Sequence, residues 1–412
     1  MNKADVVIIG GGAAGYFAAL ACAEAAPGKK VVILERAGSP LAKVKISGGG
    51  RCNVSHACYE PVKLITFYPH GGLALRGPFT RFGPQHLAEW FVNRGVALKT
   101  EADGRMFPVS DRSESIIACF ESEARRLGVE IRLGTVVGAV ESTPSGLTVE
   151  ALNEETWQAK CVLLATGGAR PGHLLAQHLG HSIVEPVPSL FTFNISDPHL
   201  SGLAGLSVPD ARLRLPGARL EQRGPLLITH WGLSGPATLR LSAWGARYLF
   251  EQNYQAELRL SWLGDYTTQK IKDLFKQLRS ENGKQRIYQA SPVSSLPLRL
   301  WERLAWQAGV KPSQHWADAS KELLELIERE LLDCPLQITG KGEFKEEFVT
   351  SGGVELDEVD FRSMESRKTP GLFLAGEVLD IDGVTGGFNF QAAWTTGWHA
   401  GRAMAQRVVG ST

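Results

Sequence analysis

The sequence predicts an α/β protein whose main sheet begins at the amino terminus and is completed by the glycine-rich end of the chain. Strand and helix signals alternate up to about residue 185, which is typical of a largely parallel sheet. From about 190 to 262 the pattern changes to short alternating strands without long helices between them. Residues 263–332 are helical in pattern, and the chain then returns to strands and glycine-rich loops.

Residues 5–35 have the order of a strand, a glycine loop, a helix and a second strand. The apolar run Val6–Ile9 leads into GGGAAG at 10–15, and the second apolar run ends 20 residues later at Glu35. Such a unit binds the pyrophosphate of a dinucleotide, because the helix amino terminus presents unpaired N–H groups and a positive dipole end. The alternative is a glycine turn in an unrelated α/β fold.

Each position of this loop has a physical role. Gly10 makes the turn off the strand, Gly12 leaves room for the pyrophosphate, and Gly15 lets the helix pack against the sheet. Glu35 is placed to accept hydrogen bonds from a ribose diol. The residues expected to contact the dinucleotide here are Gly10, Gly12, Ala13, Ala14, Gly15, Glu35 and Arg36.

Length and composition set limits on the class of protein. A chain of 412 residues is too long for one ordinary core, so two or three domains are expected. A hydrophobic content of 43% is ordinary for a globular protein, and a net charge of +1 requires neither nucleic acid nor an anionic membrane as a partner. No apolar run reaches the roughly 18 residues of a membrane span, and no signal peptide is recognisable. We therefore expect a cytoplasmic protein.

The cysteines and histidines show no metal-binding pattern. The six cysteines are scattered without a CxxC pair, and the ten histidines form no HExxH motif. This argues against a zinc site and against a disulfide framework. We expect no metal, and a reducing compartment.

The last strand and helix indicate which cofactor is bound. A strand at 372–375 runs into Gly376-Glu377, and residues 386–389 open a helix that continues to about Gln406. In two-domain flavoproteins such a returning helix points its amino terminus at the flavin and stabilises negative charge on the reduced ring. A nicotinamide-only enzyme does not need this segment, so FAD is favoured over NAD. The residues expected to bind FAD here are Gly376, Glu377, Asp380, Gly386, Gly387, Phe388, Asn389 and Phe390.

A second glycine loop, KISGGGRCN at 45–53, allows the backbone to approach the cofactor. Arg51 is placed to bind the flavin or an anionic substrate. The thiol of Cys52 could protonate a substrate carbon after hydride transfer, as a general acid does. The alternative for Cys52 is a small buried packing residue. The expected cofactor contacts are Lys45, Ser47, Gly49, Gly50, Arg51, Cys52 and Asn53.

A buried strand at 162–165 ends in the turn Thr166, Gly167 and Gly168. Its position predicts a further backbone approach to the cofactor. An ordinary turn between a strand and a helix is the alternative.

The helical segment carries a local excess of positive charge. Residues 266–311 hold nine basic and three acidic side chains, a net charge of +6 in an otherwise near-neutral chain. This indicates either a solvated helix face or a surface for a polyanion such as RNA. Trp301 and Trp306 in this segment are expected in the core.

Six motifs together resemble one known family. The chain is similar to bacterial NAD(P)/FAD-dependent flavoproteins labelled aminoacetone-oxidase-like, a family grouped with a bile-acid-pathway flavoprotein and an rRNA dihydrouridine synthase. Residues 40–44 and 66–84 depart from the family pattern. The motifs are GGGAAG (10–15), KISGGGRCNVSH (45–56), ATGGARP (165–171), THWGLSGPA (229–237), VTSGGVELDEVD (349–360) and GEVLDIDGVTGGFNFQAAW (376–394).

The resemblance implies a Rossmann-like FAD-binding domain built from both chain ends, with a β-barrel-like domain and a small helical domain inserted. The implied boundaries are 1–189 with 349–412 for the FAD domain, 190–262 with 333–348 for the β-rich domain, and 263–332 for the helical domain. His230, in the fourth motif, becomes a candidate for acid–base catalysis beside Cys52 and Arg51. The alternative for His230 is a hydrogen bond that braces its loop.

The function implied is an FAD-dependent oxidoreductase that passes electrons from NAD(P)H to a small molecule or to a uridine of large-subunit rRNA. No second GxGxxG motif is present, so NAD(P)H would bind transiently. The alternative from another functional class is a flavin-binding protein that senses redox state or scaffolds a partner without turnover.

Overall fold

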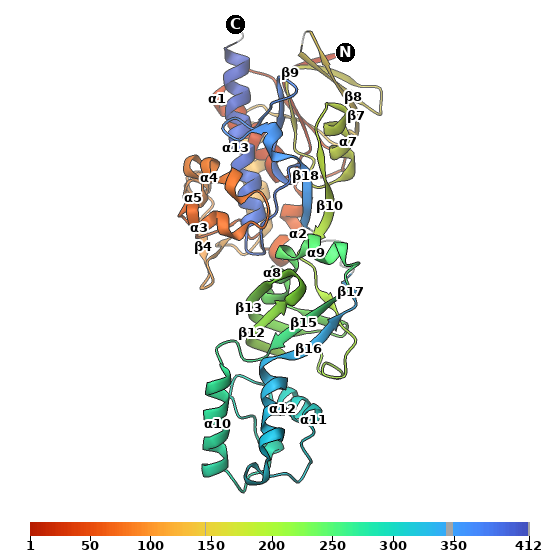
Figure 1. Cartoon of the computed structure of the whole chain (residues 1–412). Coiled ribbons are helices and arrows are strands. Elements are labelled where there is room, and N and C mark those ends of the chain that lie inside the picture. Colours follow the sequence, from red (N-terminus) through yellow and green to blue (C-terminus); the bar gives the residue numbers. More distant parts are fainter. Residues whose placement is uncertain (145, 343–348, 411–412) are drawn as a thin grey trace. The chain divides into compact units, whose positions relative to one another are not determined.

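The computed structural model describes residues 1–144, 146–342 and 349–410 (Figure 1). Contacts divide the chain into two compact units, one formed by Met1–Val187 with Val349–Thr412 and the other by Pro188–Phe348. The first unit thus contains both ends of the chain. Residues 145, 343–348 and 411–412, which fall within the predicted domains, lie outside the described residues.

The main sheet of the first unit is built around β1 (Asn2–Ile9). This strand pairs in parallel with β2 (Val31–Leu34) on one side and with β9 (Thr156–Leu164) on the other. Their apolar ends are buried on both faces, as in parallel sheets covered by helices. On the far side of β9, β21 (Leu372–Leu374) pairs in parallel, so the carboxy-terminal part completes the sheet that the amino terminus begins. The predicted α/β class with a sheet from both chain ends is confirmed.

Further strands extend this sheet and form two smaller ones. In the main sheet β6 joins β2, the pair β19–β20 joins β21, and the antiparallel pair β7–β8 joins β9. A separate sheet has the order β3-β5-β4, and β10 pairs with β18. The bounds are β3 (Ser55–His56), β4 (Leu98–Thr100), β5 (Arg105–Pro108), β6 (Glu130–Arg132), β7 (Val137–Thr143), β8 (Gly146–Ala151), β10 (Ile183–Ser189), β18 (Val349–Val354), β19 (Val359–Asp360) and β20 (Glu365–Ser366).

The first and last helices of the chain pack closely against each other. A Cβ at Gly397 of α13 (Phe388–Val409) would lie 2.5 Å from the carbonyl oxygen of Ala14 in α1 (Ala13–Ala25). One turn later, a Cβ at Gly401 would lie 2.3 Å from the carbonyl oxygen of Ala18. The spacing of four residues places both glycines on one helix face, so the two backbones can touch.

The further helices of the first unit pack against this pair, against the strands or against one another. Trp394 of α13 lies 5.3 Å, centroid to centroid, from Phe120 of α6 and 5.7 Å from Phe17 of α1, which fixes these helices around one aromatic cluster. The helices are α2 (Ala42–Gly50), α3 (Pro61–Leu64), α4 (Gly72–Arg81), α5 (Pro84–Val92), α6 (Ser113–Arg126) and α7 (Arg170–His178).

The second unit is built on a seven-stranded sheet with the order β16-β15-β12-β13-β14-β11-β17. Its two edge strands, β16 and β17, are separated in sequence only by Thr339, so the sheet curls until its edges approach each other. In the described residues the ladder is open, so the expected barrel-like domain is a curled sheet without closure. The strands are β11 (Phe193–Asn194), β12 (Ser207–Leu215), β13 (Leu220–Ile228), β14 (Gly232–Ser234), β15 (Ala256–Ser261), β16 (Cys334–Ile338) and β17 (Gly340–Lys341).

Two helices of the second unit, at Thr268–Glu281 and Lys321–Leu332, have a side-chain cap within the segment predicted to be helical. Thr267 caps one helix by accepting from the N–H of Lys270 at 3.3 Å, and Ser320 caps another by accepting from Leu323 at 3.2 Å. The apolar faces pack on the core of this unit. The helices are α8 (Pro236–Trp244), α9 (Ala246–Glu251), α10 (Thr268–Glu281), α11 (Leu298–Gln307) and α12 (Lys321–Leu332).

Among the described residues, no helix combines the length and the hydrophobicity that crossing a membrane requires.

Candidate functional site

The site begins with the glycine turn between β1 and α1. A Cβ at Gly10 would lie 2.4 Å from the carbonyl oxygen of Ala165, and one at Gly15 would lie 2.0 Å from that of Gly10. Both positions therefore require glycine. A Cβ at Gly12 would meet no described atom within 4 Å, and no described side chain caps α1. The first N–H groups of α1 are thus open to an anion.

Glu35 is held beside this turn by backbone donors. Its carboxylate accepts from the N–H of Gly11 at 2.6 Å and from the N–H of Ala37 at 2.8 Å. Each carboxylate oxygen has a second lone pair, so the group can still accept from a ribose hydroxyl. Arg36 is exposed to solvent.

The second glycine loop interrupts α2. Ser47 takes an extended ψ of 149°, and the three glycines that follow have φ of 58°, 68° and 83°. Cys52 also has a positive φ of 59°, which is uncommon for a residue with a side chain. A Cβ at Gly49 or Gly50 would meet no described atom within 4 Å, so the loop presents bare backbone. Lys45 is exposed at its start.

Three hydrogen bonds fasten the end of this loop to α13. With its amide oriented to satisfy its neighbours, the oxygen of Asn53 accepts from the N–H of Gly387 at 3.0 Å. The Ser55 hydroxyl donates to Gln391 at 2.6 Å, and the Trp394 indole donates to the Val54 carbonyl at 3.0 Å. The structure thereby joins two motifs that lie more than 300 residues apart.

The amino terminus of α13 is braced from both sides. The Asn389 side chain accepts from the N–H of Gly383 and donates to its carbonyl, both at 2.8 Å. The ring of Phe388 stacks with Phe67 at 4.4 Å and with His56 at 4.8 Å, and those two rings lie 5.8 Å from each other. These side chains therefore hold the loop, and the N–H groups of the first turn remain for a ligand.

The remaining predicted segments lie against the same strand ends. Gly376 approaches α1 so closely that its Cβ would lie 2.9 Å from the Cβ of Ala14. Glu377 accepts from the Lys43 ammonium at 2.6 Å, and its carboxylate would lie 3.8 Å from a Cβ at Gly167. The hydroxyl of Thr166 is buried and has no hydrogen-bond partner among the described residues.

Two of the three predicted catalytic residues lie in this region. The Cys52 side chain is buried, and burial raises its pKa to about 12, so the thiol stays protonated at neutral pH. The Arg51 guanidinium pairs with Glu101 at 2.7 Å and lies 4.0 Å from the centroid of the Phe107 ring. Their catalytic roles stay predictions.

His230 belongs to the second unit. It is exposed, in the turn between β13 and β14 that the Thr229 N–H closes on the Gly232 carbonyl at 2.8 Å. Its acid–base role also stays a prediction. Gly168, Asp380, Gly386 and Phe390 lie in the first unit and are half-buried.

Sequence reasoning missed a histidine in the segment that departs from the family pattern. His70 Nδ1 lies 2.6 Å from the carboxylate of Asp382, which is fully buried, and 3.0 Å from the hydroxyl of Ser351. Two residues earlier, the Tyr68 hydroxyl donates to the Phe388 carbonyl at 2.6 Å. His70 thus lies in a segment that is fastened to the start of α13. The three side chains are 281 and 312 residues apart, so no local pattern marks them.

These features fit an FAD. The open N–H groups of α1 suit its pyrophosphate, the fixed carboxylate of Glu35 suits a ribose, and the start of α13 suits an electron-rich ring edge. The unpartnered hydroxyl of Thr166 and the open space at Gly12 and Gly49 leave polar atoms and backbone for the ligand.

Comparison with known proteins agrees with this assignment. The chain is 30% identical to a ribosomal RNA dihydrouridine synthase of Escherichia coli (strain K12), and the match covers 97% of each chain. It is 29% identical to a 3-dehydro-bile acid delta(4,6)-reductase of Clostridium scindens, over 99% of this chain and 100% of that one.

Solved structures share the fold. A 3-ketosteroid-delta4-(5alpha)-dehydrogenase from Rhodococcus jostii RHA1 matches with a TM-score of 0.53 at 17% identity, covering 98% of this chain and 97% of that one. An E. coli quinol fumarate reductase matches with a TM-score of 0.52 at 15% identity, covering 100% and 72%. The family of the HI0933-like protein Rossmann domain matches residues 4–403. The chain therefore belongs to the HI0933-like family of flavoprotein oxidoreductases.

Proposed function

We propose that this protein is an FAD-dependent reductase that uses NAD(P)H to saturate a carbon–carbon double bond conjugated to a carbonyl group. The observation that carries the proposal is the junction of the second glycine loop with the start of α13, through Asn53 and Gly387. This junction puts bare backbone and a positive helix end beside each other, where a flavin ring and its substrate would lie.

The names of the two curated relatives support this chemistry. One relative makes dihydrouridine, and the other is a reductase of a 3-dehydro bile acid. Uracil has a double bond next to a carbonyl, and a 3-oxo steroid with double bonds at positions 4 and 6 has the same conjugation. The shared reaction adds hydride to one carbon and a proton to the other.

FAD would supply the hydride. The protein must hold the cofactor, stabilise charge and deliver the proton. The open N–H groups at the start of α13 would stabilise negative charge that develops at the ring edge beside them. The bare backbone at Gly49 and Gly50 would allow close approach to the ring.

For the proton, His70 is a better donor than Cys52. Its side chain is about a quarter exposed, at 27%, whereas Cys52 is fully buried. The carboxylate of Asp382 fixes the orientation of the imidazole. The Cys52 thiol, with its positive φ, would instead shape the loop backbone.

We propose rRNA as the acceptor, because the second unit offers an RNA-binding type of surface. On α10, Lys272, Lys276 and Arg279 follow one another at helical spacing and are exposed. On α11, Arg299 and Arg303 precede Trp306, which is 62% exposed, contrary to the expected core position. Cations interleaved with an exposed aromatic ring can bind phosphates and stack on an unpaired base.

A reducing cytoplasm is the proposed location. All six cysteines are free and buried, which suits a compartment where disulfides do not form.

The test is anaerobic reduction of the purified holoprotein. We expect the visible flavin absorbance to bleach on addition of NADPH or NADH, and to return when large-subunit rRNA from a deletion strain is added. That rRNA should lack one dihydrouridine that is present in the parent strain. A flavin that stays oxidised would favour a non-catalytic flavin-binding protein. Rapid bleaching with unchanged rRNA would instead point to a small-molecule acceptor.

A further inference from the structure

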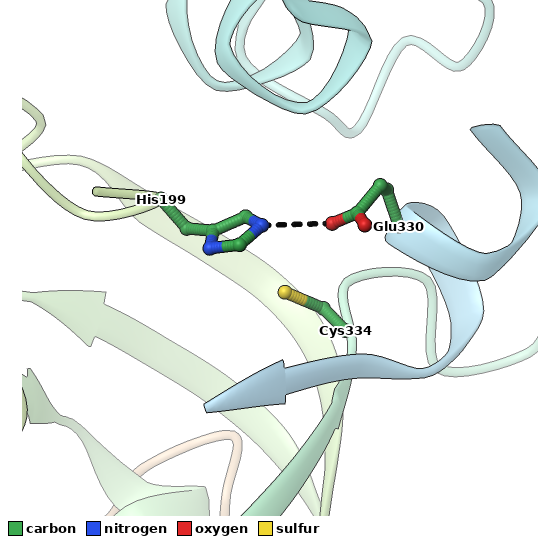
Figure 2. Close-up of side chains that lie close together, drawn as sticks. All are labelled: His199, Glu330 and Cys334. Carbon is green, nitrogen blue, oxygen red and sulfur yellow. Dashed lines mark hydrogen bonds and ion pairs between the residues drawn. The ribbon is translucent and has the colours of Figure 1, made fainter. Parts of the chain in front are cut away.

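A cluster of three metal-ligating side chains lies inside the second unit, apart from the residues assigned to FAD. Figure 2 shows the imidazole of His199, the carboxylate of Glu330 and the thiol of Cys334 turned toward one another. One donor atom of each lies within 4.8 Å of the other two. The side chains of His199 and Glu330 are 14% and 7% exposed, and Cys334 is fully buried.

The local fold positions two of these ligands. Glu330 lies in the last turn of α12, the helix ends at Leu332, and Cys334 is the first residue of β16. The sharp change from helix to strand at Asp333 therefore brings the carboxylate and the thiol to one side of the chain. His199 comes from the segment between β11 and β12, and its Nε2 lies 2.9 Å from the Glu330 carboxylate.

A further carboxylate fixes the direction of the imidazole. Asp197 accepts from the backbone N–H of His199 at 2.8 Å and also contacts the ring through Nδ1. The second ring nitrogen, Nε2, is therefore the one that faces Glu330 and Cys334. Metal-binding histidines are commonly held in this way, with the nitrogen that does not bind the metal donating to a carboxylate.

We propose that His199, Glu330 and Cys334 form a Zn²⁺ site. Nitrogen, oxygen and sulfur donors of these types bind zinc tetrahedrally at about 2.0–2.3 Å, which makes the distance between the nitrogen and oxygen ligands about 3.3 Å. The 2.9 Å separation of the imidazole and the carboxylate needs only a small expansion to reach it. Binding would displace a proton from Nε2 of His199 and another from the Cys334 thiol, and water would take the fourth position.

The competing explanation is a metal-free ion pair. A protonated His199 between Asp197 and Glu330 would also satisfy both carboxylates, and Arg329 lies 3.7 Å from Glu330 on the other side. In that case the Cys334 thiol is a neutral packing residue. The two explanations can be distinguished by measurement, because only the first predicts a bound metal with sulfur as one of its ligands.

The test uses the full-length holoprotein, stripped with a chelator and then titrated with Zn²⁺ or Co²⁺ alone. We expect about one zinc per chain by elemental analysis, and a near-ultraviolet thiolate-to-cobalt charge-transfer band with Co²⁺. Cys334→Ser should abolish the band and weaken zinc binding by more than about 100-fold. Cys119→Ser, a change of a buried cysteine in the first unit, should leave both unchanged.

A second variant keeps all three ligands. Asp197→Asn should leave the cobalt band in place and weaken zinc binding by about 10–100-fold, because the imidazole loses its charged partner. Absence of stoichiometric zinc from the wild-type protein, or cobalt binding without the charge-transfer band, would overturn the proposal and leave the ion pair. Neither readout depends on flavin reduction, so this result is independent of the proposed function.

Discussion

The two units of this chain carry their functional groups in opposite ways. In the first unit the groups proposed to bind FAD are mostly backbone N–H groups at glycines, and each set lies within a short segment such as 10–15 or 47–53. In the second unit the proposed zinc ligands are side chains, and His199 lies 131 residues from Glu330. A site made of backbone groups can be predicted from a short sequence motif, because only glycine tolerates the required geometry. A site made of side chains from distant segments has no such motif.

The largest effect is expected from a pair of glycine substitutions in the first unit. Gly15→Ala places a Cβ 2.0 Å from the Gly10 carbonyl, so the helix must move and we expect loss of both bound FAD and cooperative unfolding. Gly12→Ala has open space and should keep the melting temperature of the FAD-free protein while weakening FAD binding. Flavin-to-protein absorbance ratios and thermal melts measure the two effects. Equal behaviour of the two variants would contradict the assigned roles.

The next effect tests the histidine that no motif marks. His70→Gln should lower the rate of substrate reduction by about 10²–10⁴-fold, the range for loss of a general acid. FAD content and flavin bleaching by NAD(P)H should not change, because the substitution leaves the glycine loops intact. Cys52→Ser serves as the matched control, and we expect nearly full turnover from it. If Cys52→Ser lost more activity than His70→Gln, the thiol of Cys52 would be the proton donor instead.

A smaller effect is expected from acid titration within the first unit. The carboxylate of Glu358 accepts from the Lys368 ammonium and from the N–H of Ser182, and it lies 2.8 Å from His181. Burial acts to raise the pKa of Glu358, but these three partners lower it to about 2. A depressed carboxyl pKa stabilises the folded protein above the unfolded value near 4.5, and this contribution is lost as the pH falls toward 2. Glu358→Gln should therefore cost about 1–2 kcal/mol at pH 6, after allowance for solvent screening, and roughly half of that or less at pH 3. Urea unfolding at both pH values provides the measurement, and a pH-independent cost would contradict it.

The smallest effect concerns the second unit. Trp306→Ala should weaken rRNA binding about tenfold, as loss of one stacked base does, and should leave flavin reduction unchanged. Trp244→Ala on α8, which is 36% exposed, is the control in the same unit. Filter binding at two salt concentrations measures both. An unchanged affinity of the Trp306 variant would remove this ring from the RNA surface.

Much of the fold was predictable because its signals are local. The order of strand, glycine loop and helix at the amino terminus, and the capped helices after Thr267 and Ser320, follow from neighbouring residues. The contacts of Asn53 with Gly387 and of His70 with Asp382 were not predictable, because they join segments more than 300 residues apart. The predicted core position of Trp306 was wrong. A tryptophan on an amphipathic helix is usually buried, but this one lies on the exposed face of α11.

The contact of α13 with α1 through Gly397 and Gly401 has a consequence for synthesis of the chain. The apolar helix that follows the amino-terminal strand cannot find its final neighbour until nearly the whole chain has left the ribosome. At about 5–20 residues per second this wait lasts roughly 20–70 s. The second unit, in contrast, is one continuous segment, Pro188–Phe348, and can fold during that interval. Synthesis of the first unit therefore begins before that of the second, but its folding is completed last, and until then α1 lacks its final neighbour.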